Sequence, residues 1–169
     1  MTRPESPLAD VREFGWGTPE YRTFCELRQQ ILRAPLGLNL YDEDLGVEKN
    51  HVHIGLFDDD RLAGGAILID HGDAVGQLRQ MLVIPELRNR GLGRRVVAGV
   101  EEAARARSMR TLFLHARHIA MDFYRRCGFA TVGDEFVSHG IPHVRMEKSL
   151  DILETDDKNA VHGTKDRAP

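Results

Sequence analysis

Residues 77–99 constrain the fold more than any other part of this chain, because their pattern changes from strand to loop to helix. The apolar run Met81-Leu82-Val83-Ile84 ends at Pro85, which lacks the N–H group that a strand inside a sheet must donate. A loop over 85–93 follows, and the apolar residues behind it recur at helical spacing: Leu92, Val96, Val97, Val100, Ala103 and Ala104. The stretch therefore predicts a strand, a tight loop and an amphipathic helix.

This loop has the composition of an anion-binding site. Gly91 and Gly93 let the backbone turn tightly, and the first turn of the next helix carries N–H groups that have no partner within the helix. Arg88, Arg90 and Arg94 add positive charge around it. We expect the loop to hold a pyrophosphate; the alternative is a basic, glycine-rich turn that binds nothing.

The spelling of the loop excludes two common pyrophosphate sites. A P-loop needs Gly-Lys-Ser/Thr, whereas Gly93 is followed by Arg94 and Arg95. A dinucleotide-binding loop needs a third glycine three residues after the second, and that position is Val96.

The composition favours one soluble domain. A length of 169 residues allows a sizeable core, and the net charge of −3 argues against a general nucleic-acid binder. Cys25 and Cys127 have no metal or redox spacing, which favours a reducing compartment. No apolar run has transmembrane length and the first residues lack a signal-peptide core, so we expect a cytoplasmic protein without membrane contact.

The pattern of elements predicts a flexible arm over 1–9, one domain over 10–150 and a disordered tail over 151–169. Within the domain a helix begins at Thr18-Pro19 and ends before Pro35, and a loop or broken helix covers 35–49. The loop 137–142 joins the last two strands. The strands and the last helix are expected at 10–16, 51–57, 62–69, up to Ile84, 110–115, 119–127 (the helix), 130–136 and 143–150.

Two motifs in this order resemble the GNAT superfamily of N-acetyltransferases. The first is Arg88-x-x-Gly91-x-Gly93, and the second is Ala120-x-x-Phe123-Tyr124-x-x-x-Gly128-Phe129. The segment GIPHVRMEK over 140–148 is also similar to a group of small bacterial members. The resemblance covers about 140 residues. It implies a mixed α/β (α+β) acyl-coenzyme A N-acyltransferase fold, in which helices flank a mostly antiparallel, splayed central sheet.

The resemblance also implies that acetyl-coenzyme A is the acetyl donor and that no metal is used. In such a fold the backbone of Met81, Leu82 and Val83 would bind the pantetheine arm. The pyrophosphate would lie on the loop formed by Arg88, Asn89, Arg90, Gly91, Leu92, Gly93 and Arg94. One departure is Arg117, because many members have an Asn there that contacts the cofactor.

Tyr124 matches the family's tyrosine near the thioester sulfur. A phenol, with an ordinary pKa of about 10, can donate a proton to the leaving thiolate as a general acid. The alternative is an aromatic core residue. Candidates for the general base are Glu135 and His143, with His115 and His139 beside them. His51 and His53 share a strand face, but two ligands are weak support for a metal site.

These features leave several functions open. The first is N-acetyl transfer to a primary amine of a small molecule or peptide, by direct attack in a ternary complex. The second is a non-catalytic acyl-coenzyme A sensor, and the third is binding of another nucleotide. Residues 41–44 (Tyr-Asp-Glu-Asp) form either an acidic lip for a cationic acceptor or a solvated loop. Many relatives are homodimers, and the last two strands offer an edge for such pairing.

Overall fold

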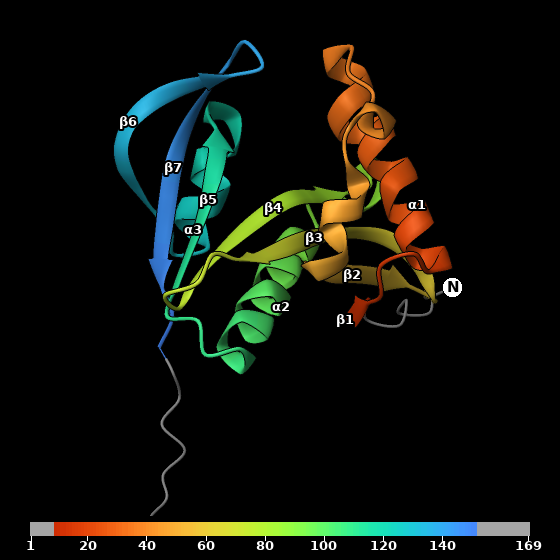
Figure 1. The fold of residues 1–169 in the computed structure, drawn as a ribbon, viewed down its shortest axis with the longest axis horizontal. Coiled ribbons are helices and arrows are strands. Elements are labelled where there is room, and N and C mark those ends of the chain that lie inside the picture. Colours follow the sequence, from red (N-terminus) through yellow and green to blue (C-terminus); the bar gives the residue numbers. More distant parts are fainter. Residues whose placement is uncertain (1–8, 152–169) are drawn as a thin grey trace, which may run out of the picture.

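The computed structural model describes residues 9–151, which build one seven-stranded sheet in the order β1-β2-β3-β4-β5-β7-β6 (Figure 1). Neighbouring strands are antiparallel except β4 and β5, which are parallel. The bounds are β1 Asp10–Phe14, α1 Pro19–Arg28, β2 Val52–Asp58, β3 Arg61–Asp70, β4 Val75–Val83, α2 Leu92–Ala106, β5 Thr111–Arg117, α3 Met121–Arg126, β6 Ala130–Ser138 and β7 Ile141–Ser149. The α+β class and the order of elements are therefore confirmed. Except for Ala9 and Asp151, the predicted arm and tail lie outside the described residues.

The boundaries differ most from the prediction at the start of β4 and at the connection between β6 and β7. β4 begins at Val75 and not at Met81, because the polar residues Gln77 and Arg79 alternate with apolar ones and hide its first half from a search for apolar runs. β6 and β7 are joined by a turn of His139 and Gly140 and not by a longer loop. Both turn residues have positive φ (52° and 73°), which matches the twist of a two-residue hairpin.

The first helix starts as expected and ends differently. Thr18 caps it, since its Oγ accepts from the backbone N–H of Tyr21 at 3.3 Å. After Arg28 the backbone widens into a π turn over Gln29–Arg33 and tightens into a 3-10 turn over Ala34–Leu36. Pro35 lies in the first positions of that new turn, where its missing N–H costs nothing.

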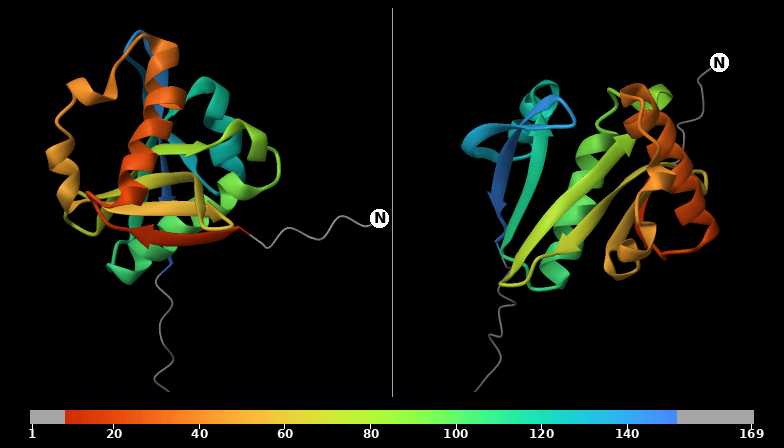
Figure 2. Two further views of the ribbon diagram at one scale, coloured as in Figure 1. Left: turned by 90° about the vertical axis from the view of Figure 1, so that its right-hand side faces the viewer. Right: turned by 45° about the horizontal axis from the view of Figure 1, so that its top comes forward.

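The sheet opens between its two parallel strands. β4 and β5 pair only over Val75–Gln77 and Thr111–Phe113, and beyond these residues the strands diverge (Figures 1 and 2). A bulge at Gln80, whose φ is +55°, interrupts the pairing of β4 with β3 and bends the strand. Residues 78–83 of β4 therefore have a strand partner on one side only among the described residues.

Helices cover both faces of the sheet. The predicted stripe of α2 is buried: Val96, Val97, Val100, Ala103 and Ala104 pack with β2 to β5 and β7 in the main core. Phe123 and Tyr124 of α3 pack against the same core. On the opposite face, Phe24 of α1 packs with residues of β2, β3 and β4. None of the helices within residues 9–151 is both long and apolar enough to cross a membrane.

A buried ion pair holds α1 to the turn before β2. The Arg28 guanidinium donates to both carboxylate oxygens of Glu48, at 2.6 and 2.9 Å, and the Tyr21 hydroxyl donates to the same carboxylate at 2.6 Å. Burial alone would raise the pKa of Glu48. The nearby His53, whose Nε2 lies 3.9 Å from the carboxylate, and the bonds donated by Arg28 and Tyr21 outweigh it and hold that pKa well below its usual range. The network fixes the π turn and the 3-10 turn that follow α1 over the open edge of β4.

Candidate active site

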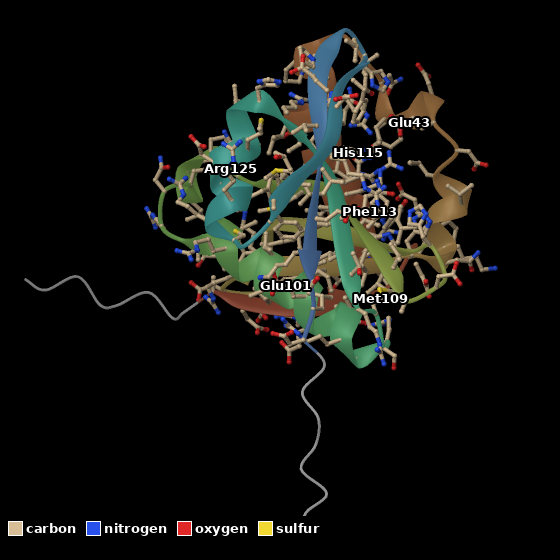
Figure 3. The ribbon with its side chains drawn as sticks, turned by 90° about the vertical axis from the view of Figure 1, so that its left-hand side faces the viewer. Glu43, Glu101, Met109, Phe113, His115 and Arg125 are labelled. Carbon is tan, nitrogen blue, oxygen red and sulfur yellow. The ribbon has the colours of Figure 1, made fainter. Side chains whose placement is uncertain are left out.

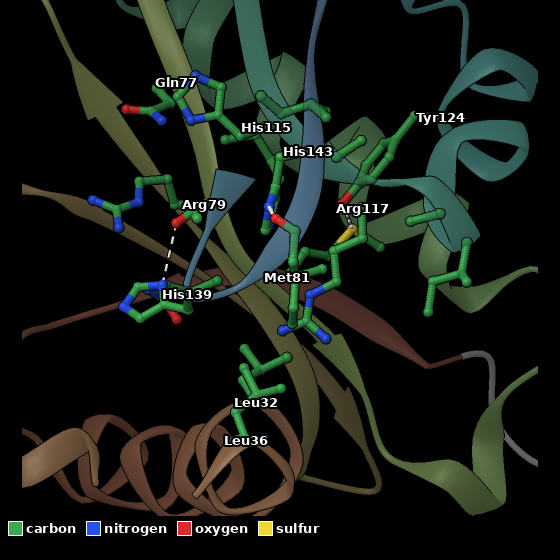
Figure 4. Close-up of a pocket in the computed structure, with 18 of the residues that line it drawn as sticks. Leu32, Leu36, Gln77, Arg79, Met81, His115, Arg117, Tyr124, His139 and His143 are labelled. Carbon is green, nitrogen blue, oxygen red and sulfur yellow. Dashed lines mark hydrogen bonds between the residues drawn. The ribbon is translucent and has the colours of Figure 1, made fainter. Parts of the chain in front are cut away.

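A cavity of about 640 Å³ occupies the opening between β4 and β5 (Figure 4). Its walls come from four parts of the chain that are distant in sequence: the turns after α1, β4, the end of β5 with α3, and the β6–β7 hairpin. Because the walls meet only after the sheet has formed and parted, the cavity is a product of the tertiary structure.

Tyr124 projects from α3 to the edge of β4. Its hydroxyl donates to the Met81 sulfur at 3.6 Å, and its ring packs edge-to-face against Phe123 and Phe129. Burial raises the pKa of Tyr124 well above that of an ordinary phenol. The hydroxyl is therefore protonated at neutral pH, and among residues 9–151 its one partner is a thioether, which is a weak acceptor.

The loop after β4 has the geometry of an anion cradle. Gly91 is the N-cap of α2 with φ of +73°, and no side chain caps the free N–H groups of the first turn. A Cβ on Gly93 would lie 3.2 Å from the Phe123 ring and 3.3 Å from the Met81 methyl group. Glycine at that position lets α2 start close to α3 and β4.

The three arginines of the loop differ in what they do. The Nε of Arg88 donates to the carbonyl of Val83 at 3.0 Å, which closes the loop onto the end of β4. Arg94 donates to the carbonyl of Arg126 at 3.3 Å and so ties α2 to the end of α3. Arg90 is exposed, and no other side chain or carbonyl of residues 9–151 is bonded to its guanidinium. Of the three arginines predicted to lie near the phosphates, Arg88 and Arg94 thus also stabilise the local structure.

Of the candidate bases, His143, His139 and His115 line the cavity. His143 Nδ1 lies 2.8 Å from the carbonyl of Ile141, and its ring stacks on Phe136. A carbonyl only accepts, so Nδ1 carries the proton and Nε2 keeps a lone pair in the neutral ring. His139 Nδ1 instead lies 3.1 Å from the hydroxyl of Ser138.

His115, on β5, lies between the rings of Phe113 on the same strand and Phe136 on β6. Figure 3 shows it beside Phe113, and the ring also packs against Phe136 with centroids 4.9 Å apart. Burial, followed by the positive charges of Arg145 and Arg79, lowers the pKa of His115. The structure thus makes this imidazole less able to hold a proton.

Glu135 lies elsewhere. Its carboxylate bonds to His118 Nε2, both side chains are about half exposed, and Glu135 is absent from the residues that line the cavity. Of the catalytic candidates, the structure therefore brings Tyr124 and His143 together at the cavity, and it leaves Glu135 outside it.

An acidic lip is wrong for residues 41–44. None of them lines the cavity, and the acidic ones are used locally. Glu43 pairs with Arg33 at 2.6 Å, Asp42 accepts from Asn39, and Asp44 caps the next turn at Gly46. Their charge stabilises the turns that cover the cavity.

The sequence patterns did not predict the part of the cavity wall that lies away from Tyr124 and the histidines. Arg79 and the apolar residues Leu32, Leu36 and Leu38 line the cavity, although no motif includes them. One signal in the sequence was available: Gln77 and Arg79 alternate with apolar residues. This alternation is typical of a strand and could have predicted that β4 begins before Met81. Within residues 9–151 no three His, Cys, Asp or Glu side chains converge as metal ligands.

Comparisons with known proteins agree with this geometry. The family model described as an acetyltransferase (GNAT) domain matches residues 38–150. A Bacillus subtilis protein named "Uncharacterized N-acetyltransferase YjcF" is 28% identical over 123 residues, which are 72% of this chain and 87% of that protein.

Solved structures share the fold at lower identity. An acyl-CoA N-acyltransferase from Pseudomonas aeruginosa superimposes with a TM-score of 0.70 at 19% identity, over 83% of this chain and 99% of that one. An aminoglycoside 6'-N-acetyltransferase complexed with coenzyme A gives a TM-score of 0.72 at 18% identity, over 84% and 97%. At such identity these structures support the fold alone. Since the family model covers the parted strands, the glycine loop and the Tyr124 helix together, the chain belongs to the GNAT acetyltransferase family.

Proposed function

We propose that this protein transfers the acetyl group of acetyl-coenzyme A to a primary amine, by direct attack within a ternary complex. The observation that carries the proposal is the Tyr124 hydroxyl, 3.6 Å from the Met81 sulfur at the unpaired edge of β4. This contact supports a role for Tyr124 as a protonated donor at the point where the two strands part, between the glycine loop and the open cavity.

The chain offers groups that fit the donor molecule. Backbone groups of Met81 and Leu82 on the unpaired edge of β4 would hold its pantetheine arm, while the N–H groups of the first turn of α2 and Arg90 would hold its pyrophosphate. When bound, acetyl-coenzyme A supplies an acetyl group activated as a thioester. The residues of the chain orient that group, shield it from water and move protons.

Proton balance assigns two roles. As the carbon–nitrogen bond forms and the carbon–sulfur bond breaks, the amine loses one proton and the sulfur gains one. Tyr124 is placed to give the second proton. His143 is placed to take the first, because its Nδ1–H bond to the Ile141 carbonyl leaves Nε2 free to accept.

Two measurements on the wild-type protein test the proposal. Acetyl-coenzyme A binding is followed by calorimetry, and free thiol release is followed with a broad panel of primary amines. Saturable binding together with amine-dependent thiol release is the expected result. Binding without release from any amine would favour an acyl-coenzyme A sensor, and competition by ATP or NAD in the absence of coenzyme A binding would favour another nucleotide.

A further inference from the structure

An acetyl donor held as proposed above would leave one half of the cavity, along β4, free. The glycine loop follows Val83, and the Tyr124 hydroxyl marks the thioester position at Met81. Arg79 lies two residues further along the strand, on the side away from the loop. At about 3.3 Å per residue this is roughly 6–7 Å beyond Met81, which is where an acceptor and not the donor would lie.

This half of the cavity is positively charged. Three arginines and three histidines line the cavity, and no Asp or Glu is among its described lining residues. Glu43 neutralises Arg33 through the ion pair at 2.6 Å. Arg79 and Arg117 line the cavity, and neither forms an ion pair or a side-chain hydrogen bond with any other residue from 9 to 151.

The direction of the Arg117 side chain also indicates that this half of the cavity is positively charged. In Figure 4, Arg117 extends from the end of β5 into the cavity, toward Leu32 and Leu36 of the turns that cover it. The charge of Arg79 also reaches His115, where it helps to lower the pKa of the imidazole after burial itself. Within the described residues no carboxylate compensates this field on the cavity side.

We propose that the acceptor amine carries an oxyanion, a carboxylate or a phosphate, and that Arg79 and Arg117 bind this group. The inference rests on the proposed acetyl transfer and adds the class of its acceptor. A guanidinium matches the fork of two oxygens in either anion, which makes arginine suited to this recognition. A polycationic acceptor would meet repulsion here, because the acidic residues 42–44 lie outside the cavity.

The apolar wall indicates the body of such an acceptor. Leu32, Leu36, Leu38 and Ile141 face the same space as the two arginines. An amine with a carboxylate at one end and a hydrocarbon group at the other, such as an apolar amino acid, would satisfy both walls. Leucine and phenylalanine are therefore the first probes, and phosphoethanolamine tests the phosphate source.

The experiment compares acids with their neutral partners. Thiol release is measured for leucine against leucinamide, phenylalanine against phenylalaninamide, and phosphoethanolamine against ethanolamine. The amine of an amino acid amide loses its proton more readily than that of the free acid, so a preference for the acid opposes intrinsic reactivity. We expect kcat/KM to favour at least one anionic member by about tenfold or more, since a hydrogen bond to a charged group contributes about 1.5–3 kcal/mol.

Variants identify the binding groups. Arg79→Gln is expected to raise the KM for the anionic acceptor roughly 10- to 100-fold and to leave the KM for acetyl-coenzyme A within about twofold. Arg117→Gln is expected to do the same; a rise in the KM for acetyl-coenzyme A instead would remove Arg117 from the proposal. Arg61→Gln, an exposed arginine at the start of β3, removes the same charge outside the cavity and should change neither constant.

Failure of this inference is separable from failure of acetyl transfer. Thiol release with amides equal to or faster than acids would overturn the anionic acceptor and leave the acetyltransferase intact. If no amine gives thiol release, acid and amide binding to the coenzyme A-loaded protein is measured by calorimetry in wild type and Arg79→Gln. Acid binding that Arg79→Gln abolishes would support the anion site without catalysis; failure of every acid to bind or react would overturn it.

Discussion

At the scale of single residues, Tyr124 is partly buried, and among residues 9–151 its hydroxyl has the Met81 sulfur as its one partner. A buried tyrosine in a core usually bonds to a stronger acceptor. The hydroxyl is therefore better explained as a group kept for a ligand than as part of a plain aromatic core residue. The rings of Phe123 and Phe129 fix its direction.

Replacing Tyr124 by Phe should separate catalysis from binding. Tyr124→Phe removes the proton donor and leaves the ring packing, so kcat should fall by about 100-fold while the Kd for acetyl-coenzyme A changes little. Thiol release and calorimetry measure the two quantities. Tyr41→Phe removes a hydroxyl from an exposed tyrosine outside the cavity and serves as the matched control. An unchanged kcat in Tyr124→Phe would exclude Tyr124 as the general acid.

Arg90 and Arg88 of the glycine loop should differ in how their replacement affects the thermal stability of the protein. Arg90→Gln removes a charge that has no described protein partner, so the Kd for acetyl-coenzyme A should rise by about 3- to 30-fold with an unchanged Tm. Arg88→Gln also breaks the 3.0 Å bond to the Val83 carbonyl, so its Tm should fall as well. Thermal unfolding of the free protein checks this difference. Equal Tm values for both variants would contradict the structural role of Arg88.

At the scale of elements, the start of α2 lies close to α3 because Gly93 has no side chain. A Cβ there would press on the Phe123 ring and on the Met81 methyl group. Phe123 packs against the Tyr124 ring, and the Met81 sulfur accepts from the Tyr124 hydroxyl. The contact therefore links the glycine loop mechanically to the proposed proton donor. The same pair of helices is tied by Arg94 and the carbonyl of Arg126.

Gly93→Ala should displace α3 relative to β4. The overpacking is expected to cost about 1–2 kcal/mol of unfolding free energy and to lower kcat, because Tyr124 moves with Phe123. Urea unfolding and thiol release check the two effects. Ala98→Gly, which changes an exposed α2 position by the same methyl group, should lower stability by about 1 kcal/mol without affecting kcat at saturating substrate. A Gly93→Ala protein with wild-type kcat would show that this contact is not transmitted to Tyr124.

At the scale of the whole molecule, the cover of the cavity depends on a buried charge network. Arg28 is fully buried and Glu48 nearly so, and their ion pair joins α1 to the turn before β2. Removing one partner leaves the other charge buried without compensation, which is far more costly than the loss of an exposed pair. The position of Leu32, Leu36 and Leu38 on the cavity wall thus depends on residues that do not line the cavity.

Glu48→Gln should lower the free energy of unfolding by roughly 3–5 kcal/mol at pH 7. The ion pair of Glu43 and Arg33 gives the control, since the Glu43 side chain is 44% exposed and Glu43→Gln should cost less than about 1 kcal/mol. Urea unfolding at a series of pH values measures both. A similar loss in the two variants would contradict the special weight of the buried pair.

The pH series carries a sign as well. The pKa of Glu48 is lower in the folded state than in the unfolded chain, so its stabilisation is present above the ordinary carboxyl pKa of about 4.3 and is lost as the pH falls further. The lowered pKa values of His51 and His115 act in the same direction, because each contributes above about pH 6.5 and less below it. The difference between wild type and Glu48→Gln should therefore shrink at acidic pH. A constant difference down to pH 3 would show that the carboxylate charge is not the cause.

The helices, the strands and the two motifs were largely predictable from local patterns in the sequence. Local rules were sufficient for the Thr18 cap, the buried stripe of α2 and the glycine loop, because each depends on residues that are neighbours along the chain. These rules also indicated the family and, through it, Tyr124. They failed where polar residues interrupted a strand, as in the first half of β4.

Which side chains share the cavity depends on contacts that form only in the folded chain. Arg79, Arg117, His143 and Leu32 come from four segments, and they meet because β4 bends at Gln80 and parts from β5. The same structure separated Glu135 from the other candidates and used the charge of residues 42–44 for local bonds. Sequence patterns report which face of an element is apolar, whereas the strand pairings and ion pairs that close a site join residues far apart in the chain.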